Sequence, residues 1–308
     1  MLRFVFIIIS LACSQALEFE VKTVSLASVT TASESRIIGG SPVSIQQYPY
    51  TVQILYNSRL YCGGSLLTQR HVLSAAHCFV DTNNNIVSPR SFSIRAGSAT
   101  LNTGGSVYGV SALILHERYN VPLRDNDVAV MVLSATVRLS NTVDVAYIPV
   151  QGEQVRDNAT VFHVGWGRTH LEISTPSAVL NGVAVRTVNL AVCTARYALL
   201  QNLTGQPFPV TSNMLCAGLL DIGGADACQG DSGGPLIYGN VVVGITSWGY
   251  GCAEPQFPGV NARVSSYTNW INATVMRYNA GPPLPSLGGM LLLFSILISA
   301  GATKISFL

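Results

Sequence analysis

Short apolar runs alternate with polar, glycine-containing turns from residue 37 to about residue 278. Residues 50–56 and 241–247 are typical runs, and residues 102–105 are a typical turn. Regularly spaced runs of this kind predict an all-β sandwich or barrel. The pattern changes over residues 264–278, where apolar side chains recur at helical spacing. We expect this segment to be a helix that packs against the β structure.

The alternation stops at both ends of the chain. At the N-terminus, Arg3 precedes an apolar run over residues 4–12, and small residues lead to Ala16. These features are typical of a secretory signal peptide, and the run is too short to cross a hydrocarbon core of ~30 Å. We therefore expect residues 1–16 to be removed and the protein to be secreted.

The C-terminal end has a different order of residues. Small residues at 279–281 lead into a spacer over residues 282–289, and an apolar tail, interrupted at Lys304, follows. This order is typical of a signal for glycosylphosphatidylinositol (GPI) attachment. A short membrane anchor, or an apolar tail with neither role, remains an alternative. We expect residues 280–308 to be a GPI signal that tethers the protein to the cell surface.

Composition narrows the function classes. Only 10% of the residues are charged and the formal net charge is +2, which argues against a nucleic-acid partner. Of the seven cysteines, Cys13 lies in the expected signal peptide. The other six predict three disulfides in an oxidising compartment, although they allow fifteen pairings. They are Cys62, Cys78, Cys193, Cys216, Cys228 and Cys252.

A secreted chain can also be glycosylated, and Asn158, Asn202 and Asn272 each begin an Asn-x-Thr sequon. The motif is short and common by chance, so we expect only some of these sites to be occupied. No group of cysteines and histidines has the spacing of a metal site, so we expect no metal or other cofactor.

Three dense motifs carry the candidate chemistry, around His77, Asp127 and Ser232. A serine hydroxyl is a weak nucleophile until a base takes its proton, and histidine suits this role because its pKa lies near neutrality. A buried carboxylate can hold the imidazole in the useful tautomer. Glycines beside the serine allow a turn that aims backbone N–H groups at the developing negative charge. Together the motifs predict acyl-transfer catalysis.

These motifs resemble the chymotrypsin-like (trypsin) serine proteases. The most specific matches are Ala-Ala-His-Cys at 75–78 and Gly-Asp-Ser-Gly-Gly-Pro at 230–235, and the resemblance extends from residue 36 to about residue 278. It implies two six-stranded antiparallel β-barrels with a C-terminal helix, within a peptidase domain over residues 37–279. It also implies a monomeric serine endopeptidase whose partners are polypeptide substrates and protein protease inhibitors.

The resemblance assigns roles to matched residues. It makes Ser232 the nucleophile, His77 the general base and acid, and Asp127 the carboxylate that orients the histidine. The N–H groups of Gly230 and Ser232 would form the oxyanion hole. The implied disulfides are Cys62–Cys78, Cys193–Cys216 and Cys228–Cys252.

The resemblance also predicts trypsin-like specificity. Asp226 lies six residues before Ser232, where trypsins carry the carboxylate that pairs with substrate Arg or Lys. A solvated loop carboxylate is the alternative. Gly249 and Gly259 match the glycines that keep the pocket open, and the segment Ser247-Trp248-Gly249 would pair with the substrate backbone.

Several residues depart from the common pattern or have no evident role. Tyr250 stands where a small residue is usual, which predicts a narrower pocket rim, and Asn261 stands where an aromatic residue is frequent. The remaining histidines have no evident partner in the sequence, and we interpret them as structural or exposed. They are His71, His116, His163 and His170.

Arg36-Ile37 resembles an activation site. In the family, cleavage there frees the α-amino group of the isoleucine, which forms a buried ion pair with the carboxylate beside the catalytic serine, here Asp231. Breaking such a pair costs ~3–5 kcal/mol, which couples the cut to ordering of the site. Residues 17–36 would be the propeptide. Because no cysteine tethers this segment, we expect it to leave after cleavage.

Two alternative hypotheses do not require an active protease. The chain could be a non-catalytic homologue used in adhesion or as a decoy, or a tethered protein whose interactions matter more than its turnover. The first usually lacks a triad residue, whereas His77, Asp127 and Ser232 are all present. The sequence therefore favours an active, trypsin-like endopeptidase.

Overall fold

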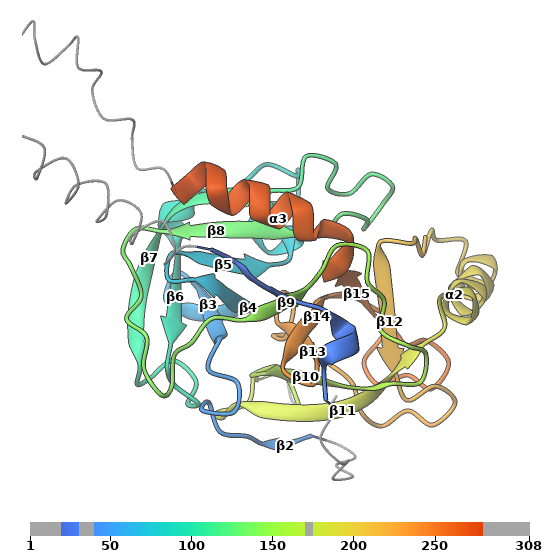
Figure 1. The fold of residues 1–308 in the computed structure, drawn as a ribbon. Coiled ribbons are helices and arrows are strands. Elements are labelled where there is room, and N and C mark those ends of the chain that lie inside the picture. Colours follow the sequence, from blue (N-terminus) through green and yellow to red (C-terminus); the bar gives the residue numbers. More distant parts are fainter. Residues whose placement is uncertain (1–19, 31–39, 170–174, 280–308) are drawn as a thin grey trace, which may run out of the picture.

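The first half of the chain forms a closed β-barrel, and the alternation of apolar and polar residues along its strands places one set of side chains in the interior. In β6, for example, Phe92, Ile94 and Ala96 are buried, whereas the residues between them are partly exposed. The barrel is antiparallel, with strand order β3-β4-β5-β8-β7-β6 (Figure 1). Its strands are β3 (Thr51–Tyr56), β4 (Arg59–Thr68), β5 (His71–Ser74), β6 (Phe92–Ala96), β7 (Ser106–Leu115) and β8 (Ala129–Leu133).

A second barrel follows, with order β14-β13-β10-β11-β12-β15 and closure by pairing of β14 with β15. Its strands are β10 (Thr160–Gly165), β11 (Asn181–Val188), β12 (Met214–Gly218), β13 (Pro235–Tyr238), β14 (Val241–Trp248) and β15 (Gly259–Arg263). The computed structural model describes residues 20–30, 40–169 and 175–279. In this part of the chain, the prediction of two six-stranded antiparallel barrels is confirmed.

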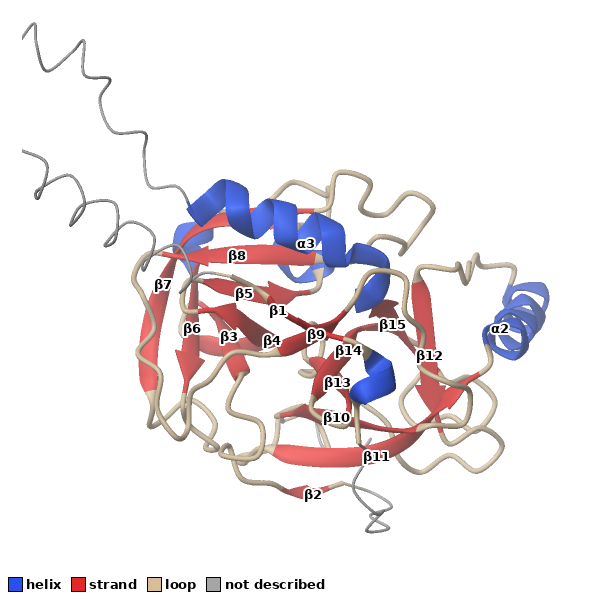
Figure 2. Cartoon of the chain, viewed as in Figure 1, coloured by secondary structure: helices blue, strands red, loops and turns tan. Residues whose placement is uncertain are grey.

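Helices are few among the described residues, and strands dominate (Figure 2). The predicted C-terminal helix is α3 (Val264–Asn279), whose buried face includes Tyr267 and Ile271. A further helix, α2 (Leu190–Thr204), was not anticipated. The side chain of Asn189 accepts hydrogen bonds at its start, and the left-handed Gly205 ends it. Three short 3-10 helices are η1 (Leu26–Ser28), η2 (Ala76–Phe79) and η3 (Pro89–Ser91).

Three short strands extend the second sheet beyond the closed barrel. They are β1 (Lys22–Val24), β2 (Ser41–Pro42) and β9 (Tyr147–Pro149). β2 pairs with β11, β9 pairs with β14, and β1 runs parallel to β9. Part of the predicted propeptide therefore supplies the outermost strand of this sheet.

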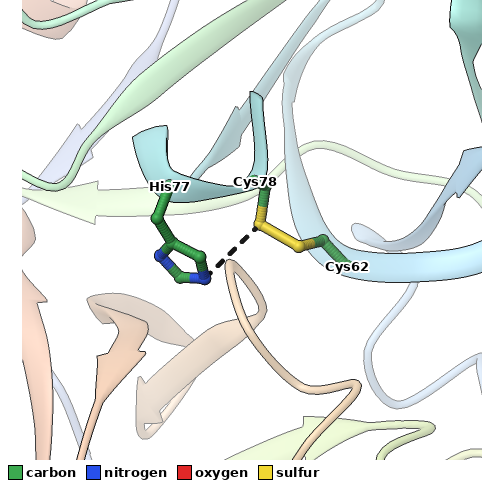
Figure 3. Close-up of side chains that lie close together, drawn as sticks. All are labelled: Cys62, His77 and Cys78. Atoms are coloured by element: carbon green, nitrogen blue, oxygen red, sulfur yellow. Dashed lines mark hydrogen bonds between the residues drawn. A yellow bond between two sulfur atoms is a disulfide. The ribbon is translucent and has the colours of Figure 1, made fainter. Parts of the chain in front are cut away.

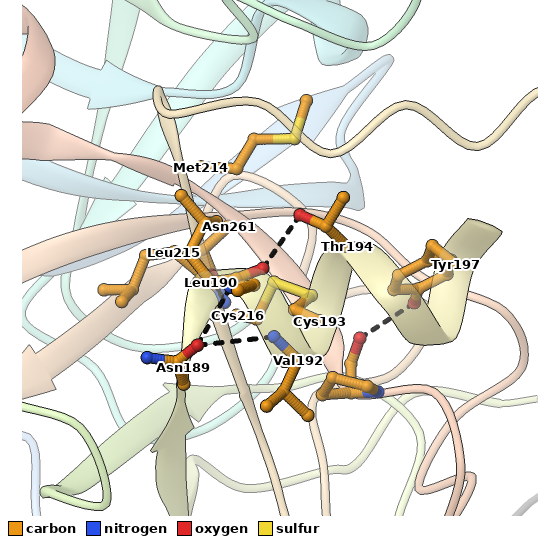
Figure 4. The surroundings of a disulfide bond; sticks show 12 residues. Asn189, Leu190, Val192, Cys193, Thr194, Tyr197, Met214, Leu215, Cys216 and Asn261 are labelled. Carbon is orange, nitrogen blue, oxygen red and sulfur yellow. Dashed lines mark hydrogen bonds between the residues drawn. A yellow bond between two sulfur atoms is a disulfide. The ribbon is translucent and has the colours of Figure 1, made fainter.

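The three disulfides implied by the resemblance are confirmed. Cys62–Cys78 joins β4 to η2 beside His77 (Figure 3). Cys193–Cys216 ties α2 to β12 (Figure 4). Cys228–Cys252 joins the two loops that flank β13 and β14. Each bond links segments that are distant in sequence and close in the fold.

Several predictions concern other features of the chain. Residues 1–16 and 280–308 lie outside the described residues, so the signal-peptide and GPI predictions are untested. Within the described part, no helix is long and apolar enough to cross a bilayer. Asn158 and Asn202 are exposed and Asn272 is half-buried, while their glycosylation stays a prediction.

Candidate active site

His77 and Asp127 form a hydrogen-bonded pair at one edge of the first barrel. His77 lies in η2, directly after β5, and Asp127 lies just before β8. The Nδ1–H group of His77 donates to Oδ2 of Asp127 at 2.7 Å, and the backbone N–H of His77 donates to Oδ1 at 2.8 Å. Ser247 also donates to Oδ2. With Nδ1 protonated, Nε2 is left to act as a base.

The electrostatics of this pair stabilise its charged form. Burial alone would lower the pKa of His77, but the charge of Asp127 and their hydrogen bond outweigh burial and raise the pKa. Burial alone would raise the pKa of Asp127, which is 4% exposed. The charge and hydrogen bond of His77, with further hydrogen bonds, hold that pKa below its usual value.

The loop that carries Asp127 is fixed to the second barrel through its neighbours. Asp125 accepts hydrogen bonds from Thr211 at 3.0 Å and from Asn213 at 3.2 Å. Asn126 adopts a positive φ and donates through Nδ2 to two carbonyls of the preceding loop. These contacts hold Asp127 between the two barrels, where residues of both can approach it.

Ser232 enters the same site from the second barrel, in the turn that precedes β13. Its carbonyl accepts the N–H of Gly63 at 2.8 Å and lies 3.9 Å from Sγ of Cys78. The next residue, Gly233, has φ +76°, and a Cβ there would stand 2.1 Å from Oγ of Ser74. Only glycine permits this close approach to the first barrel. The structure therefore places the backbone of Ser232 against η2, the short helix that carries His77.

The predicted oxyanion hole lies in the same turn. Gly230 has φ +102°, and neither its N–H nor that of Ser232 has an acceptor among the described residues. Asp231, between them, turns inward and accepts N–H groups of Gly167 at 2.7 Å and Cys228 at 3.1 Å. The turn can thus offer two backbone donors to one oxygen.

A cavity of about 170 Å³ opens beside Ser232 and has Asp226 in its lining. The Asp226 carboxylate accepts the N–H of Ala227 at 2.8 Å and that of Ala253 at 3.4 Å. Burial raises its pKa to about 7 despite these hydrogen bonds. A Cβ at Gly259 would stand 2.9 Å from Oδ1 of Asp226, so that glycine makes room for the carboxylate. This cavity has the chemistry of a site for a cationic side chain.

The remaining predicted pocket residues lie around the same cavity. Ser247, Trp248 and Gly249 all line it. A Cβ at Gly249 would make only ordinary contacts, so its absence serves to leave space in the cavity. Tyr250 is exposed, is not part of the cavity lining and packs edge-on against Phe257, with ring centres 5.3 Å apart, so the narrower rim stays a prediction.

His163 is a pocket residue that the sequence did not reveal. It is buried in β10, with Nδ1 3.2 Å from Oγ1 of Thr246 and Nε2 3.9 Å from Oδ1 of Asp226. Burial lowers its pKa to about 4. Asn261 lines the same cavity, and its Nδ2 donates to the carbonyl of Leu215. His163 is buried on the same strand as Val161, two residues away, but only the fold places it near Asp226.

The other histidines are structural where they are described. His71 is fully buried, with Nδ1 2.7 Å from Oγ1 of Thr68. His116 packs against the rings of Tyr267 and Trp270. His170 lies outside the described residues.

A larger cavity, of about 570 Å³, lies behind the pocket and is lined by Gly40, Asp226 and Asp231. Burial raises the pKa of Asp231 to about 6, although two backbone N–H groups oppose the shift. No lysine or arginine of the described ranges forms an ion pair with Asp231. Arg36 and Ile37 lie outside these ranges, so the predicted ion pair is untested.

Cys62, His77 and Cys78 are also grouped closely enough to suggest a metal site. Figure 3 shows why the donor set does not fit, because the two sulfur atoms are bonded to each other and offer no thiolate. Nε2 of His77 lies 3.8 Å from Sγ of Cys78. The cluster is a disulfide that supports the histidine.

Comparisons with known proteins agree with this geometry. The sequence model of the family described as Trypsin matches residues 37–271. Alkaline trypsin B of Manduca sexta is 44% identical over 246 residues, which cover 78% of this chain and 91% of the relative. Trypsin CFT-1 of Choristoneura fumiferana is 42% identical over 255 residues, covering 80% and 95%. A vitellin-degrading protease of Bombyx mori is 35% identical over 240 residues, covering 78% and 86%.

Proposed function

The chain belongs to the trypsin family of serine endopeptidases, and we propose that it cleaves polypeptides after Arg or Lys through Ser232, His77 and Asp127. The observation that carries this proposal is the placement of Asp226. Its side chain is only 8% exposed and lines a cavity that also borders Ser232, the proposed nucleophile. A cationic side chain in this cavity would place the adjoining peptide bond beside Ser232.

The chemical step uses the His77–Asp127 pair. Nε2 of His77 takes the proton of Ser232 Oγ as the oxygen attacks the substrate carbonyl, and the N–H groups of Gly230 and Ser232 stabilise the negative charge. His77 then gives the proton to the leaving amine, and an acyl-enzyme remains. Water attacks the ester by the same route in reverse and regenerates Ser232. Asp127 stabilises the imidazolium in both halves of the reaction.

Selectivity follows from the cost of leaving a buried carboxylate unpaired. An Arg or Lys side chain supplies the positive partner that the Asp226 carboxylate lacks. A neutral side chain would instead displace water and leave the carboxylate without a partner. Gly249 and Gly259 leave the space that a long side chain needs. The proposed subsite therefore excludes neutral residues by electrostatics as well as by shape.

Activation is proposed to follow cleavage after Arg36. The new α-amino group of Ile37 would enter the cavity beside Asp231 and neutralise a carboxylate whose pKa burial raises to about 6. Because Asp231 lies between Gly230 and Ser232, the ion pair would fix the turn that forms the oxyanion hole. The uncut chain would be a zymogen.

The proposed activity is tested by producing the chain from Leu17 onward, cutting it after Arg36, and comparing matched peptide substrates with Arg, Lys, Phe or Ala before the scissile bond. We expect strong turnover of the Arg and Lys substrates, and none with Ser232→Ala. Correctly cut, folded protein that turns over none of these substrates contradicts the proposal and favours a binding role.

Two proposals concern location. Residues 1–16 would direct secretion, and residues 280–308 would direct attachment of a lipid anchor. Treating expressing cells with a GPI-specific phospholipase tests the second proposal, because it should release the protein into the medium. Protein that stays on the cells, or is already in the medium before treatment, rules out the anchor. Gel filtration tests the proposed monomer.

A further inference from the structure

The segment before the proposed cleavage site is bound along the second barrel. β1 pairs with β9 in parallel, in the register Lys22–Tyr147 to Val24–Pro149. The pairing continues past the strand, because the N–H of Val150 donates to the carbonyl of Val24 at 3.2 Å. Figure 1 shows this blue segment passing from β9 to the side of β13 and β14. An extended peptide that adds a strand to a sheet edge is a recurrent mode of peptide recognition.

Apolar side chains anchor the segment on both sides of β1. Val21 is 7% exposed and belongs to the main hydrophobic core. Val24, Leu26 and Val29 are half-buried against a second cluster, which includes Val161, Leu236 and Val241. Thr23, between Val21 and Val24, is exposed. One face of the segment is therefore buried in the domain while the other faces solvent.

Polar contacts fix the register of the segment. The carboxylate of Glu153 accepts the hydroxyl of Ser25 and the backbone N–H of Leu26, both at 2.6 Å. Hydrogen bonds to an ionised acceptor are stronger than neutral ones. Nζ of Lys22 lies 3.9 Å from Oδ1 of Asp144 and 5.2 Å from the centre of the Tyr147 ring.

The catalytic domain is also shaped to receive Val29. Gly239 lies in the turn between β13 and β14, with φ +62°. A Cβ at this position would stand 2.4 Å from Cγ1 of Val29, well inside contact distance. The turn and the segment are thus complementary at a point where any larger residue would block the approach.

We propose that this surface is a second peptide-binding site, separate from the active-site cleft, and that residues 20–30 remain bound there as a non-covalent second chain after cleavage at Arg36. The retention step rests on the activation proposed above. Every contact described here joins a residue before Arg36 to a residue after it without involving the cleaved bond, so the cut removes none of them. The lack of a cysteine in the segment, which led us to expect its departure, is offset by strand pairing, apolar burial and the Glu153 contacts.

The test uses the Ser232→Ala chain, cut by limited treatment with added trypsin. N-terminal sequencing checks that the termini are at Leu17 and Ile37 and that no cut has occurred after Lys22. We expect residues 17–36 to co-elute with the catalytic chain in gel filtration and to appear as one complex in native mass spectrometry, but as two chains after denaturation. A peptide that separates from the cut protein during gel filtration overturns the proposal.

Two substitutions on the segment show whether the observed contacts hold it. Val21→Asp puts a charge into the core and should weaken retention by at least about tenfold. Thr23→Asp adds the same charge on the exposed face two residues away and should leave retention unchanged. Equal effects of both changes would contradict the proposed binding mode.

A second pair acts from the catalytic domain, where the segment is untouched. Gly239→Ala forces its Cβ against Val29. It should shorten the time for which the segment stays bound to the catalytic chain on the order of tenfold. Gly205→Ala is the matched control, because Gly205 also has a positive φ, of +69°, but a Cβ there meets no atom within 4 Å. Both changes carry the same backbone strain, so only the first should release the segment. Release by both, or by neither, contradicts the role of Gly239.

The activity of the cut wild-type chain separates the two proposals. If activity appears on cleavage and the segment elutes separately, activation stands and retention is wrong. If the segment co-elutes but cleavage produces no activity, retention stands and the proposed activation is wrong.

Discussion

Asp127 and Asp226 both have buried carboxylates near one cavity, which Asp226 lines and Asp127 approaches through its hydrogen bond with Ser247. Their environments nevertheless move their pKa values in opposite directions. Asp127 faces His77 and Ser247, whose charge and hydrogen bonds keep its pKa below the usual value. Asp226 receives two backbone N–H groups, which do not offset burial, and its pKa rises to about 7. Asp127 has a cationic partner within the protein, the His77 imidazolium, whereas Asp226 has no lysine or arginine partner among the described residues.

Asp231 belongs with Asp226 in this comparison. Its pKa is raised to about 6, and no described lysine or arginine pairs with it. In the proposed mechanism, a substrate supplies the cation for Asp226 and the chain's own new terminus supplies the cation for Asp231. A carboxylate that is paired within the protein serves catalysis directly, and an unpaired one is suited to recognising an incoming positive charge.

The largest effect is expected from Asp127→Asn, which keeps the shape but removes the negative charge. His77 would then lose the acceptor that fixes Nδ1–H, and Nε2 would no longer be free as a base. A loss of about 10⁴-fold in kcat is established for this change in the family, and we expect the same order here, measured with an Arg substrate.

Ser247→Ala is the matched control, because it removes one hydrogen bond to Asp127 but keeps the charge. We expect a loss of no more than about tenfold. If Asp127→Asn costs no more than Ser247→Ala, the charge of Asp127 has no special role.

A smaller but more selective effect is expected from Asp226→Ser. Removing the charge should lower kcat/KM for Arg and Lys substrates by about 10³-fold, because a buried ion pair with the substrate is lost. The value for a Phe substrate should change by less than about tenfold. The measurement is the ratio of kcat/KM values for the matched peptides at one pH.

Asp221→Ser supplies the comparison for this prediction. Asp221 lies five residues before Asp226 in the sequence. Its side chain is 63% exposed and pairs with Arg196. We expect its loss to leave the Arg-to-Phe ratio unchanged. A similar fall in the ratio for both variants would mean that Asp226 acts through general charge and not as a pocket residue.

Stability should also vary with pH in opposite senses for the two kinds of carboxylate. Asp226 and Asp231 hold protons up to about pH 7 and pH 6 in the folded state, but release them near 3.8 when unfolded. Their contributions therefore make the uncut Ser232→Ala chain less stable as pH rises from about 4 to 7. Asp127 stabilises the fold above 3.8, and that stability is lost as pH falls through its lowered pKa.

Urea unfolding at several pH values measures these slopes. Asp231→Asn should flatten the decline in the free energy of unfolding between pH 4 and 6. Above pH 6 it should stabilise the uncut chain by on the order of a few kcal/mol. The same substitution at the exposed Asp221 should leave the slope intact. A decline that persists unchanged in Asp231→Asn would show that its carboxyl is not the group that titrates.

The sequence predicted those parts of the protein that depend on local or highly specific motifs. The residues around His77 and Ser232 identify the chemistry because the reaction itself restricts them, and α3 follows from helical spacing of Tyr267, Ile271 and similar residues. Helix α2 was missed because exposed apolar residues such as Leu203 obscure its buried face.

Other features depend on contacts between distant residues. The docking of residues 20–30 requires Glu153 and Gly239, which lie far along the chain and have no motif that links them to the segment. His163 is similar, since no local pattern reveals that its side chain will lie 3.9 Å from Asp226. Such contacts between residues far apart in the sequence become evident only from the folded structure.

The smallest effects are expected at His163, where polarity near Asp226 can be changed without touching any carboxylate. Nε2 of His163 has no hydrogen-bond partner in the described structure, whereas Nδ1 has Thr246. His163→Leu removes both nitrogens and should change unfolding free energy by about 1 kcal/mol or less. Thr246→Val keeps the imidazole but removes its partner, and should cost about 1–3 kcal/mol. With both variants, kcat/KM for Arg substrates should fall by less than about tenfold. If His163→Leu instead lowers it as strongly as Asp226→Ser does, the histidine takes part in recognition of the cation, and Asp226 does not act alone.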